Sequence, residues 1–247
     1  MLLLLVPPTT LVTTQYTIAF DPLDGSSIIP ANWTVGTIIS LWDGPSALNQ
    51  APSTSQIAAI LGVYGPRTTV IIALRIPNTT KNSNPPTETC FELSLDSTTN
   101  TWAVTRPTLH LAPKSRYFAP ANLRAAAEDR AYMALITDYI ERKYTLRYSG
   151  GLVPDVVHML VQGQGVYLSP VTGKSKAKLR RLYELCPLAL VVECAGGRAL
   201  DPVDGREVLR TEVRDCEETG GLLCGSADEV EDAVVRLVDS DPRKEVL

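Results

Sequence analysis

The 247-residue sequence predicts a layered α/β protein. In the first part of the chain, short runs of Val, Ile and Thr follow one another between turn residues, as strands do. In the second part, such runs alternate with longer stretches whose apolar residues recur near the 3.6-residue period of a helix. The length suits one large domain or two modest ones. Prolines at 107, 113 and 120 mark the change of character, so we predict two domains, residues 1–106 and 107–247.

The first part is expected to consist mainly of strands. Five short segments rich in β-branched or aromatic residues are the expected strands: 16–20, 35–42, 68–74, 90–95 and 101–104. Residues 55–61, which precede Gly62, are expected to form a turn or two of helix. Residues 78–89 are rich in Asn, Thr and Pro and are expected to form a loop.

The second part is expected to alternate between helices and strands. Asn122 is expected to cap a helix with this apolar face: Leu123, Ala126, Met133, Ile136 and Ile140. The other expected helices are 153–160 and 176–195, the latter broken at Pro187, and the expected strands are 143–148, 165–169 and 220–225. Ser226 and Glu229 fit a capping box. The final helix that follows has this apolar face: Val230, Ala233, Val234, Leu237 and Val238.

Composition excludes several classes of protein. Hydrophobic residues make up 45% and charged residues 20% of the chain, as in ordinary globular proteins. A net charge of −4 without a long basic run gives no reason to expect nucleic acid binding. The apolar residues 1–6 are too short to span a membrane, and no positive residues precede them as in a signal peptide. Five cysteines without a C-x-x-C pair indicate a reducing compartment. We expect a cytoplasmic location, with a plastid as the alternative.

The most informative stretch is residues 20–27, which read Phe-Asp-Pro-Leu-Asp-Gly-Ser-Ser. Pro22 keeps the residue before it out of the helical region, and Asp24-Gly25 favours a turn. The backbone N–H groups after the turn can point one way and attract an anion. Mg²⁺ prefers one or two carboxylates together with phosphate oxygens. The stretch therefore suits a metal and phosphate site, although an ordinary Asp-rich turn after a strand explains it equally well.

Two further stretches could bind a phosphorylated ligand. Residues 147–151, Arg-Tyr-Ser-Gly-Gly, bring a guanidinium and a phenol next to paired glycines; a plain strand-to-helix turn is the alternative. Residues 174–181 are basic and precede Glu184, and a solvated basic helix face is the alternative. Lys178 and Glu184 would point to different sides of an ideal helix. A P-loop ending at residues 173–175 is rejected, because Leu168 stands where the first glycine of that motif is required.

Taken in order, several motifs resemble the sugar-bisphosphatase family, meaning fructose-bisphosphatases and sedoheptulose-bisphosphatases, over nearly the full length of the chain. The motifs that carry the resemblance are 20–27, 35–38, 64–69, 143–148, 150–156, 176–180 with 182–184, and 195–197. Residues 64–69 and 143–148 look more like the sedoheptulose branch. The resemblance implies the sugar-phosphatase fold, a sugar bisphosphate substrate and a homo-oligomer, either a dimer or a tetramer.

The resemblance also implies a role for each site residue. The Mg²⁺ ligands would be the carboxylates of Asp21, Asp24 and Glu184 and the carbonyl of Leu23. The phosphate that is removed would be held by Gly25, Ser26 and Ser27. Arg147 and Tyr148 would bind the distal phosphate, with the arginine supplied within the subunit or across a subunit interface. The sugar would be lined by Gly150, Gly151, Leu152 and Lys178. Water would attack the phosphate with the help of two or three metal ions.

One departure from the family leaves two hypotheses open. Family members carry a helical segment before the first strand, with two adjacent metal-binding glutamates and a water-orienting aspartate, whereas the first acidic residue here is Asp21. We therefore expect an N-terminally truncated chain that lacks this helical layer and contains no catalytic base of its own. One hypothesis is an active phosphatase for sedoheptulose 1,7-bisphosphate or fructose 1,6-bisphosphate. The other is an inactive remnant that binds sugar phosphate or a partner subunit. A monoesterase like the inositol phosphatases fits residues 64–69 and 147–151 less well.

Overall fold

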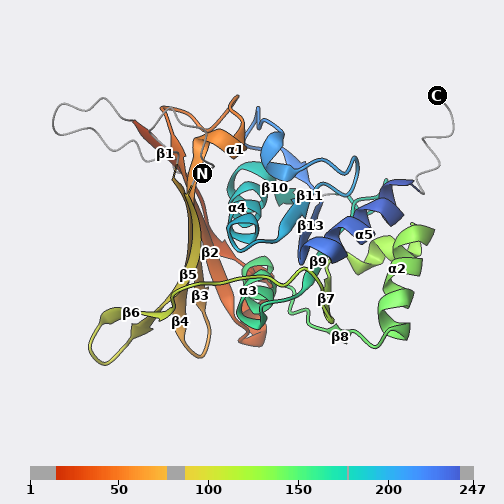
Figure 1. The fold of residues 1–247 in the computed structure, drawn as a ribbon, viewed down its shortest axis with the longest axis horizontal. Helices are drawn as coiled ribbons and strands as arrows, with labels where there is room; N and C mark the ends of the chain where they lie inside the picture. Colours follow the sequence, from red (N-terminus) through yellow and green to blue (C-terminus); the bar gives the residue numbers. More distant parts are fainter. Residues whose placement is uncertain (1–14, 77–86, 177, 240–247) are drawn as a thin grey trace.

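The computed structural model describes residues 15–76, 87–176 and 178–239. The described elements form four layers (Figure 1). A six-stranded sheet comes first, helices α3 and α4 form the second layer, a five-stranded sheet the third, and helices α2 and α5 the fourth. The predicted layered α/β class is confirmed.

The six-stranded sheet is antiparallel, and its strands pair in chain order. Its strands are β1 (Tyr16–Asp24), β2 (Val35–Asp43), β3 (Gln56–Tyr64), β4 (Thr68–Ile76), β5 (Thr87–Asp96) and β6 (Thr101–Arg106). All five strands predicted in the first part are present. The helix predicted over 55–61 is wrong, because only α1 (Pro52–Ser55) is helical and β3 pairs with strands on both sides. Tertiary pairing overrides local preference there. The predicted loop lies mostly outside the described residues.

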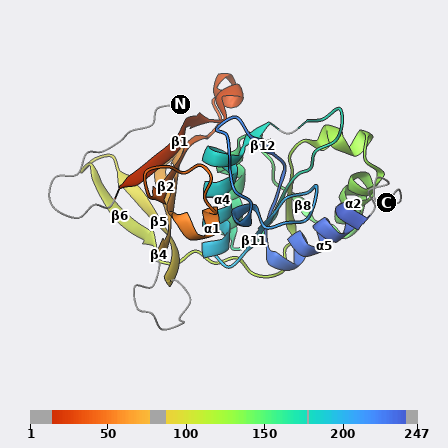
Figure 2. The same ribbon diagram turned by 90° about the horizontal axis from the view of Figure 1, so that it is seen from above.

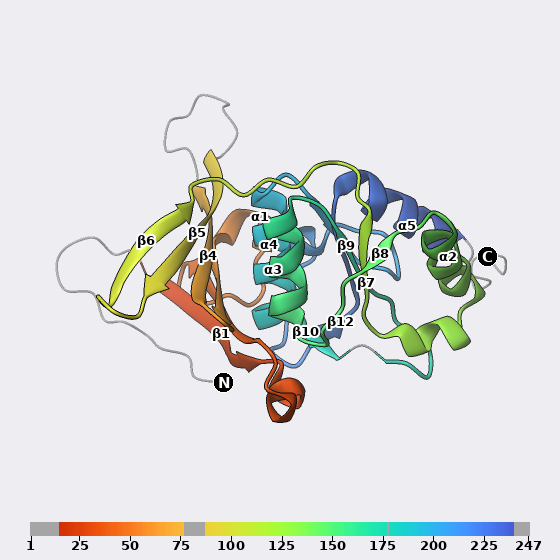
Figure 3. The same ribbon diagram turned by 90° about the horizontal axis from the view of Figure 1, so that it is seen from below.

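The two faces of this sheet differ. Along β2, Ile38, Ser40 and Trp42 are fully buried, whereas Ile39 and Leu41 between them stay partly accessible. Helices α3 and α4 pack on the buried face, as Figure 3 shows. No described helix or strand covers the opposite face.

The five-stranded sheet is mixed and has the order β11-β13-β9-β7-β8. Its strands are β7 (Tyr117–Pro120), β8 (Thr145–Leu146), β9 (Val166–Ser169), β11 (Arg198–Leu200) and β13 (Leu222–Gly225). Strand β7 runs parallel to both β8 and β9, so the amino ends of these three strands share one edge and their carboxyl ends share the other. The six-stranded sheet ends at Arg106 and this one begins at Tyr117. A domain boundary at residue 107 stays a prediction.

Helices separate the sheets and cover the outer face of the second one; Figure 2 shows α4 between the sheets. The helices are α2 (Arg130–Glu141), α3 (Leu152–Gln162), α4 (Cys186–Cys194) and α5 (Ala227–Asp239). Short helical turns are η1 (Ser26–Ala31), η2 (Leu123–Ala127), the π-helical η3 (Arg181–Leu185) and η4 (Val208–Arg210). A two-stranded ladder joins β10 (Leu179–Arg180) to β12 (Thr219–Gly220).

The helix predicted over residues 176–195 is longer than the one observed, α4. The chain is extended through Arg180, because residues 179–180 pair with β12, and α4 begins only at Cys186. Pro187 lies in the first turn of α4, where no backbone N–H is needed, so it does not break the helix.

The predicted face of the helix after Asn122 is also wrong. Asp129 rather than Asn122 caps α2, accepting hydrogen bonds from the N–H groups of Ala131 and Tyr132. The interruption before Arg130 resets the helical phase, so Met133 and Ile140 are exposed. The buried face is Tyr132, Leu135, Ile136 and Tyr139.

At the start of α5, the side chains of Ser226 and Glu229 make other contacts than those of the predicted capping box. Ser226 accepts a hydrogen bond from the N–H of Gly165, and Glu229 accepts from the N–H of Ser115 and the hydroxyl of Tyr144. The two residues of the predicted capping box thus connect α5 to neighbouring segments. The predicted apolar face of α5 is present, with Val230, Ala233 and Leu237 buried against the second sheet.

Candidate active site

The stretch 20–27 forms the end of β1 and a turn. Asp21 pairs with Ile38 and Asp24 with Gly36, so β1 holds one more residue than β2 between these two pairs. This β-bulge removes Leu23 from regular pairing and exposes it. Gly25 then adopts a left-handed conformation at φ +84° and starts η1, on which Ser26 and Ser27 are exposed. The sharp turn predicted from the sequence is therefore present.

Asp24 is held by the amino end of α3. A side chain at Gly36 would lie 2.5 Å from the Val153 side chain, so glycine at this position of β2 allows α3 to approach closely. The N–H of Val153 donates to Asp24 Oδ2 at 2.7 Å. Only 7% of Asp24 is exposed, and burial is the main reason that its pKa rises to about 6, with the nearby Asp21 charge adding to the rise.

Glu184 reaches the same place from η3. Its carboxylate accepts a hydrogen bond from the backbone N–H of Arg180, where β10 ends. Burial raises the pKa of Glu184 to about 7, and the charges of Asp21 and Asp24 contribute in the same direction. Single π-helical turns inside helices are rare and often occur at functional sites.

The three carboxylates form one cluster. One oxygen from each of Asp21, Asp24 and Glu184 lies within 4.8 Å of the others. Each carboxylate accepts a hydrogen bond from a backbone N–H. Val153 donates to Asp24, Arg180 donates to Glu184, and Leu23 donates to Asp21 Oδ1 at 3.0 Å. Lone pairs of the carboxylates therefore remain for a cation. Three clustered carboxylates, with the pKa values of Asp24 and Glu184 raised, fit a hard divalent cation such as Mg²⁺, which would offset their mutual repulsion.

Residues 147–152 link this cluster to an open cavity. Gly151 and Leu152 are buried, and a side chain at Gly151 would lie 3.1 Å from Ile28 of η1, so the loop packs against the turn after Asp24. Asp155 fixes the loop, because its carboxylate accepts from the N–H groups of Ser149 at 2.7 Å and Gly150 at 3.2 Å. This role was not predicted from the sequence, where the available signal is an acid in the first turn of a helix after paired glycines.

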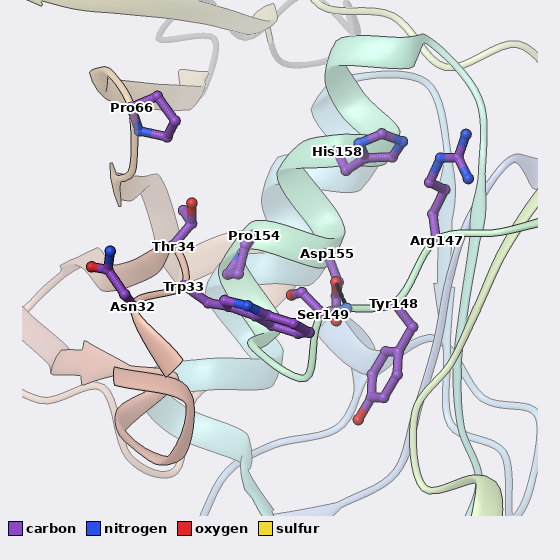
Figure 4. A pocket seen from close by; sticks show the side chains of 10 residues that line it. All are labelled: Asn32, Trp33, Thr34, Pro66, Arg147, Tyr148, Ser149, Pro154, Asp155 and His158. Carbon is purple, nitrogen blue, oxygen red and sulfur yellow. Dashed lines mark hydrogen bonds between the residues drawn. The ribbon is translucent and has the colours of Figure 1, made fainter. Parts of the chain in front are cut away.

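The cavity, about 500 Å³ in volume, lies beside α3 (Figure 4). It is lined by Asn32, Trp33, Thr34, Pro66, Arg147, Tyr148, Ser149, Pro154, Asp155 and His158. The Arg147 guanidinium lies 5.6 Å from the centre of the Tyr117 ring and points toward His158, whereas Tyr148 projects the other way. Burial and the Arg147 charge lower the pKa of His158. None of the three clustered carboxylates lines this cavity.

The basic stretch is divided by the structure. Lys178 is exposed and precedes β10, so the helical register considered for Lys178 and Glu184 does not apply. Arg181 is 7% exposed; its Nη1 lies 3.3 Å from Asp201, and its Nε lies 3.9 Å from Glu218. Sequence reasoning missed this buried arginine, because its neighbours in the sequence suggest only a solvated basic run.

Comparison with known proteins gives the family. Residues 111–237 match the C-terminal domain of fructose-1-6-bisphosphatase, and residues 5–81 match its N-terminal domain. The chain belongs to the fructose-1-6-bisphosphatase family. The resemblance predicted from the motifs is confirmed.

Relatives of both branches of this family match. The chloroplastic sedoheptulose-1,7-bisphosphatase of Spinacia oleracea is 38% identical over 87% of this chain and 52% of its own length. The class 1 fructose-1,6-bisphosphatase of Syntrophotalea carbinolica is 33% identical over 89% of this chain and 63% of its own length. The chain spans about half the length of the chloroplastic relatives it matches.

Solved structures agree with the fold. A Toxoplasma gondii protein assigned as a sedoheptulose-1,7 bisphosphatase superposes with a TM-score of 0.80 at 34% identity, covering 90% of this chain and 69% of that one. The fructose-1,6-bisphosphatase of Leishmania major gives 0.76 at 27% identity, with the same coverage. The predicted sugar-phosphatase fold is confirmed. None of the helices within the described residues is long and apolar enough to cross a membrane.

Proposed function

We propose that this chain provides the metal- and sugar-binding part of an Mg²⁺-dependent phosphatase that removes the 1-phosphate of sedoheptulose 1,7-bisphosphate, and to a lesser extent of fructose 1,6-bisphosphate. The observation that carries the proposal is the convergence of Asp21, Asp24 and Glu184 within 4.8 Å. The preference for the seven-carbon sugar rests on the relatives, since the chloroplastic sedoheptulose-1,7-bisphosphatases are 38% identical and the class 1 fructose-1,6-bisphosphatase is 33% identical.

Each group of residues has a role in this proposal. The three carboxylates and the carbonyl of Leu23 hold the cations, and the bulge at Leu23 leaves that carbonyl outside regular pairing. Mg²⁺ held by these groups would neutralise charge on the phosphate oxygens and lower the pKa of a water bound to it. The N–H groups of Gly25, Ser26 and Ser27 bind the phosphate that is removed. We assign no general base among the described residues.

The other end of the substrate would meet residues 147–152 and Lys178. The backbone of Gly150, Gly151 and Leu152 contacts the sugar. Tyr148 binds the distal phosphate. Arg147 projects to the side opposite Tyr148, which favours a role of this arginine in the site of a second protomer within a homo-oligomer. The five thiols are free, which suits a reducing compartment such as the cytoplasm.

Phosphate release tests the proposal directly. The chain is incubated with Mg²⁺ and either bisphosphate, and compared with Asp24→Ala and with Asp43→Ala, which removes an exposed carboxylate from the end of β2. We expect turnover by the wild type and Asp43→Ala only, faster with the sedoheptulose substrate. Wild-type turnover no higher than that of Asp24→Ala would overturn the proposal that this chain is catalytic. Saturable, Mg²⁺-dependent binding of the bisphosphate would then support the non-catalytic sugar-phosphate binder.

A further inference from the structure

A second polar cavity lies at the opposite edge of the five-stranded sheet from residues 147–152. Its residues precede the three parallel strands: Lys114–Arg116 come before β7, Arg142 and Tyr144 before β8, and Gln164 before β9. The cavity has a volume of about 450 Å³ and is also lined by Glu229 of α5. Helix α3, which donates to Asp24 from its amino end, ends near Gln164, and its 11 residues span roughly 16 Å. The two sites are therefore separate.

Positive charge dominates this cavity. Lys114, Arg116 and Arg142 bring three cations, against one carboxylate from Glu229. Arg142 is held in place by Asp138 at 3.2 Å and by the hydroxyl of Tyr144 at 2.8 Å. Among the described residues, neither Lys114 nor Arg116 forms an ion pair, and both are exposed. Two cations are thus available to a ligand.

The cavity wall is fixed by buried hydrogen bonds. Glu229 is 5% exposed and accepts from the N–H of Ser115 at 3.1 Å and from the Tyr144 hydroxyl at 3.0 Å. Both bonds go to Oε1, so one oxygen of the carboxylate is satisfied within the wall and part of its negative charge is offset there. The N–H of Arg116 donates to Gln164 Oε1 at 3.0 Å, which leaves the amide NH₂ of Gln164 to donate elsewhere. Tyr144 stays protonated, because burial and Glu229 raise its pKa to about 12.

We propose that this cavity is a second anion site, which binds the phosphate group of a small metabolite through Lys114, Arg116 and Arg142. A guanidinium fork matches phosphate oxygens in geometry and an ammonium adds charge, whereas a monocarboxylate would leave part of the positive charge uncompensated. The volume suits a ligand of the size of a sugar phosphate. The site is independent of the function proposed above, because it shares no residue with the carboxylate cluster or with residues 147–152.

The test is a calorimetric titration in EDTA, so that no metal supports phosphate at the carboxylate cluster. The probes are inorganic phosphate and glycerol 3-phosphate, added to wild-type protein and to Lys114→Ala/Arg116→Ala. The matched control is Arg206→Ala/Arg210→Ala, which likewise removes two exposed positive charges. Thermal unfolding of all three proteins verifies folding, since every substituted side chain is exposed. We expect at least about tenfold weaker binding only in the Lys114/Arg116 variant, equivalent to about 1.4 kcal/mol.

The two probes separate the sources of the phosphate group. Tighter binding of glycerol 3-phosphate assigns the cavity to phosphate esters, and equal binding assigns it to the phosphate group alone. Binding should weaken as ionic strength rises, because exposed charges are screened. The proposal is overturned if wild-type protein binds neither probe, or if both double variants lose affinity to the same extent.

Discussion

The carboxylate cluster and the 147–152 segment are two regions of one candidate site, and the protein builds them differently. Asp24 and Glu184 are largely buried between packed elements, and each carboxylate receives a backbone N–H. Arg147 and Tyr148 are exposed beside an open cavity. The first region is organised by the fold itself, so substitutions there should act on metal binding. In the second region the side chains of Arg147 and Tyr148 are free to meet a ligand, so substitutions there should act on substrate binding.

The largest effect is expected from Asp24→Asn. Asparagine can still accept the Val153 N–H, but it removes a charge from the metal cluster. Phosphate release should fall by at least about 1,000-fold, equivalent to about 4 kcal/mol. Mn²⁺ binding followed by electron paramagnetic resonance should weaken in parallel. Asp43→Asn, at the exposed end of β2, is the control and should retain both properties. Unchanged Mn²⁺ affinity in Asp24→Asn would show that the cluster is not the metal site.

A smaller effect, on substrate affinity, is expected from Arg147→Ala. Loss of a charge-assisted hydrogen bond to phosphate should raise KM by about 10- to 100-fold while kcat changes little. Steady-state kinetics on the bisphosphate substrate measures this. Arg206→Ala, an exposed arginine elsewhere, should leave KM unchanged.

Mixing two variants tests whether Arg147 acts within its own chain or in a neighbouring protomer. If Arg147 serves the neighbouring protomer, Arg147→Ala and Asp24→Asn chains combined before assay should form hybrid sites with intact Arg147 and Asp24. The mixture should then have more activity and a lower KM than either variant alone. A mixture no better than the sum of its parts would place Arg147 in the site of its own chain.

The pKa shifts predict how the metal-free protein responds to pH. Asp24 and Glu184 have ordinary pKa values near 4 when unfolded, but about 6 and 7 when folded. Between these values the folded state binds more protons, so the free energy of unfolding should fall as pH rises from about 4 to 8, by on the order of a few kcal/mol. Urea unfolding at several pH values measures this. Asp24→Asn/Glu184→Gln should flatten the decline, and saturating Mg²⁺ should reduce it. An identical decline in the double variant would contradict the assignment.

The smallest effect is expected from Arg181→Met. Arg181 connects the start of η3 to Asp201 and Glu218 without belonging to the metal cluster. Loss of Arg181 should displace the Glu184 carboxylate and lower Mn²⁺ affinity roughly tenfold, as changes to residues that support metal ligands do. Arg181→Lys should restore part of the affinity. Arg198→Met, which removes an arginine paired with Glu207 and Glu231, should leave metal binding intact. Equal losses in both variants would indicate a general loss of stability instead.

Local patterns predicted much of the fold and failed where packing decides. Runs rich in β-branched residues predicted β2 and β4, and the predicted apolar stripe of α5 was correct, because these segments bury one face in a regular way. The segment 55–61 was misread because its small and apolar residues fit either structure until β2 and β4 pair with it. The face of α2 was misplaced because Asp129 starts the helix seven residues after Asn122.

Residue types alone were enough to predict the turn at Asp24–Gly25 and the family. Pro22 fixes its own φ, and Gly25 tolerates the left-handed conformation that the turn requires, so the turn needs no distant partner. Tertiary structure alone decided that Glu184 lies beside Asp24, because the two are far apart in the chain and meet only when η3 packs against β1 and β2. It also decided their proton affinity, since burial and like charges act only after folding.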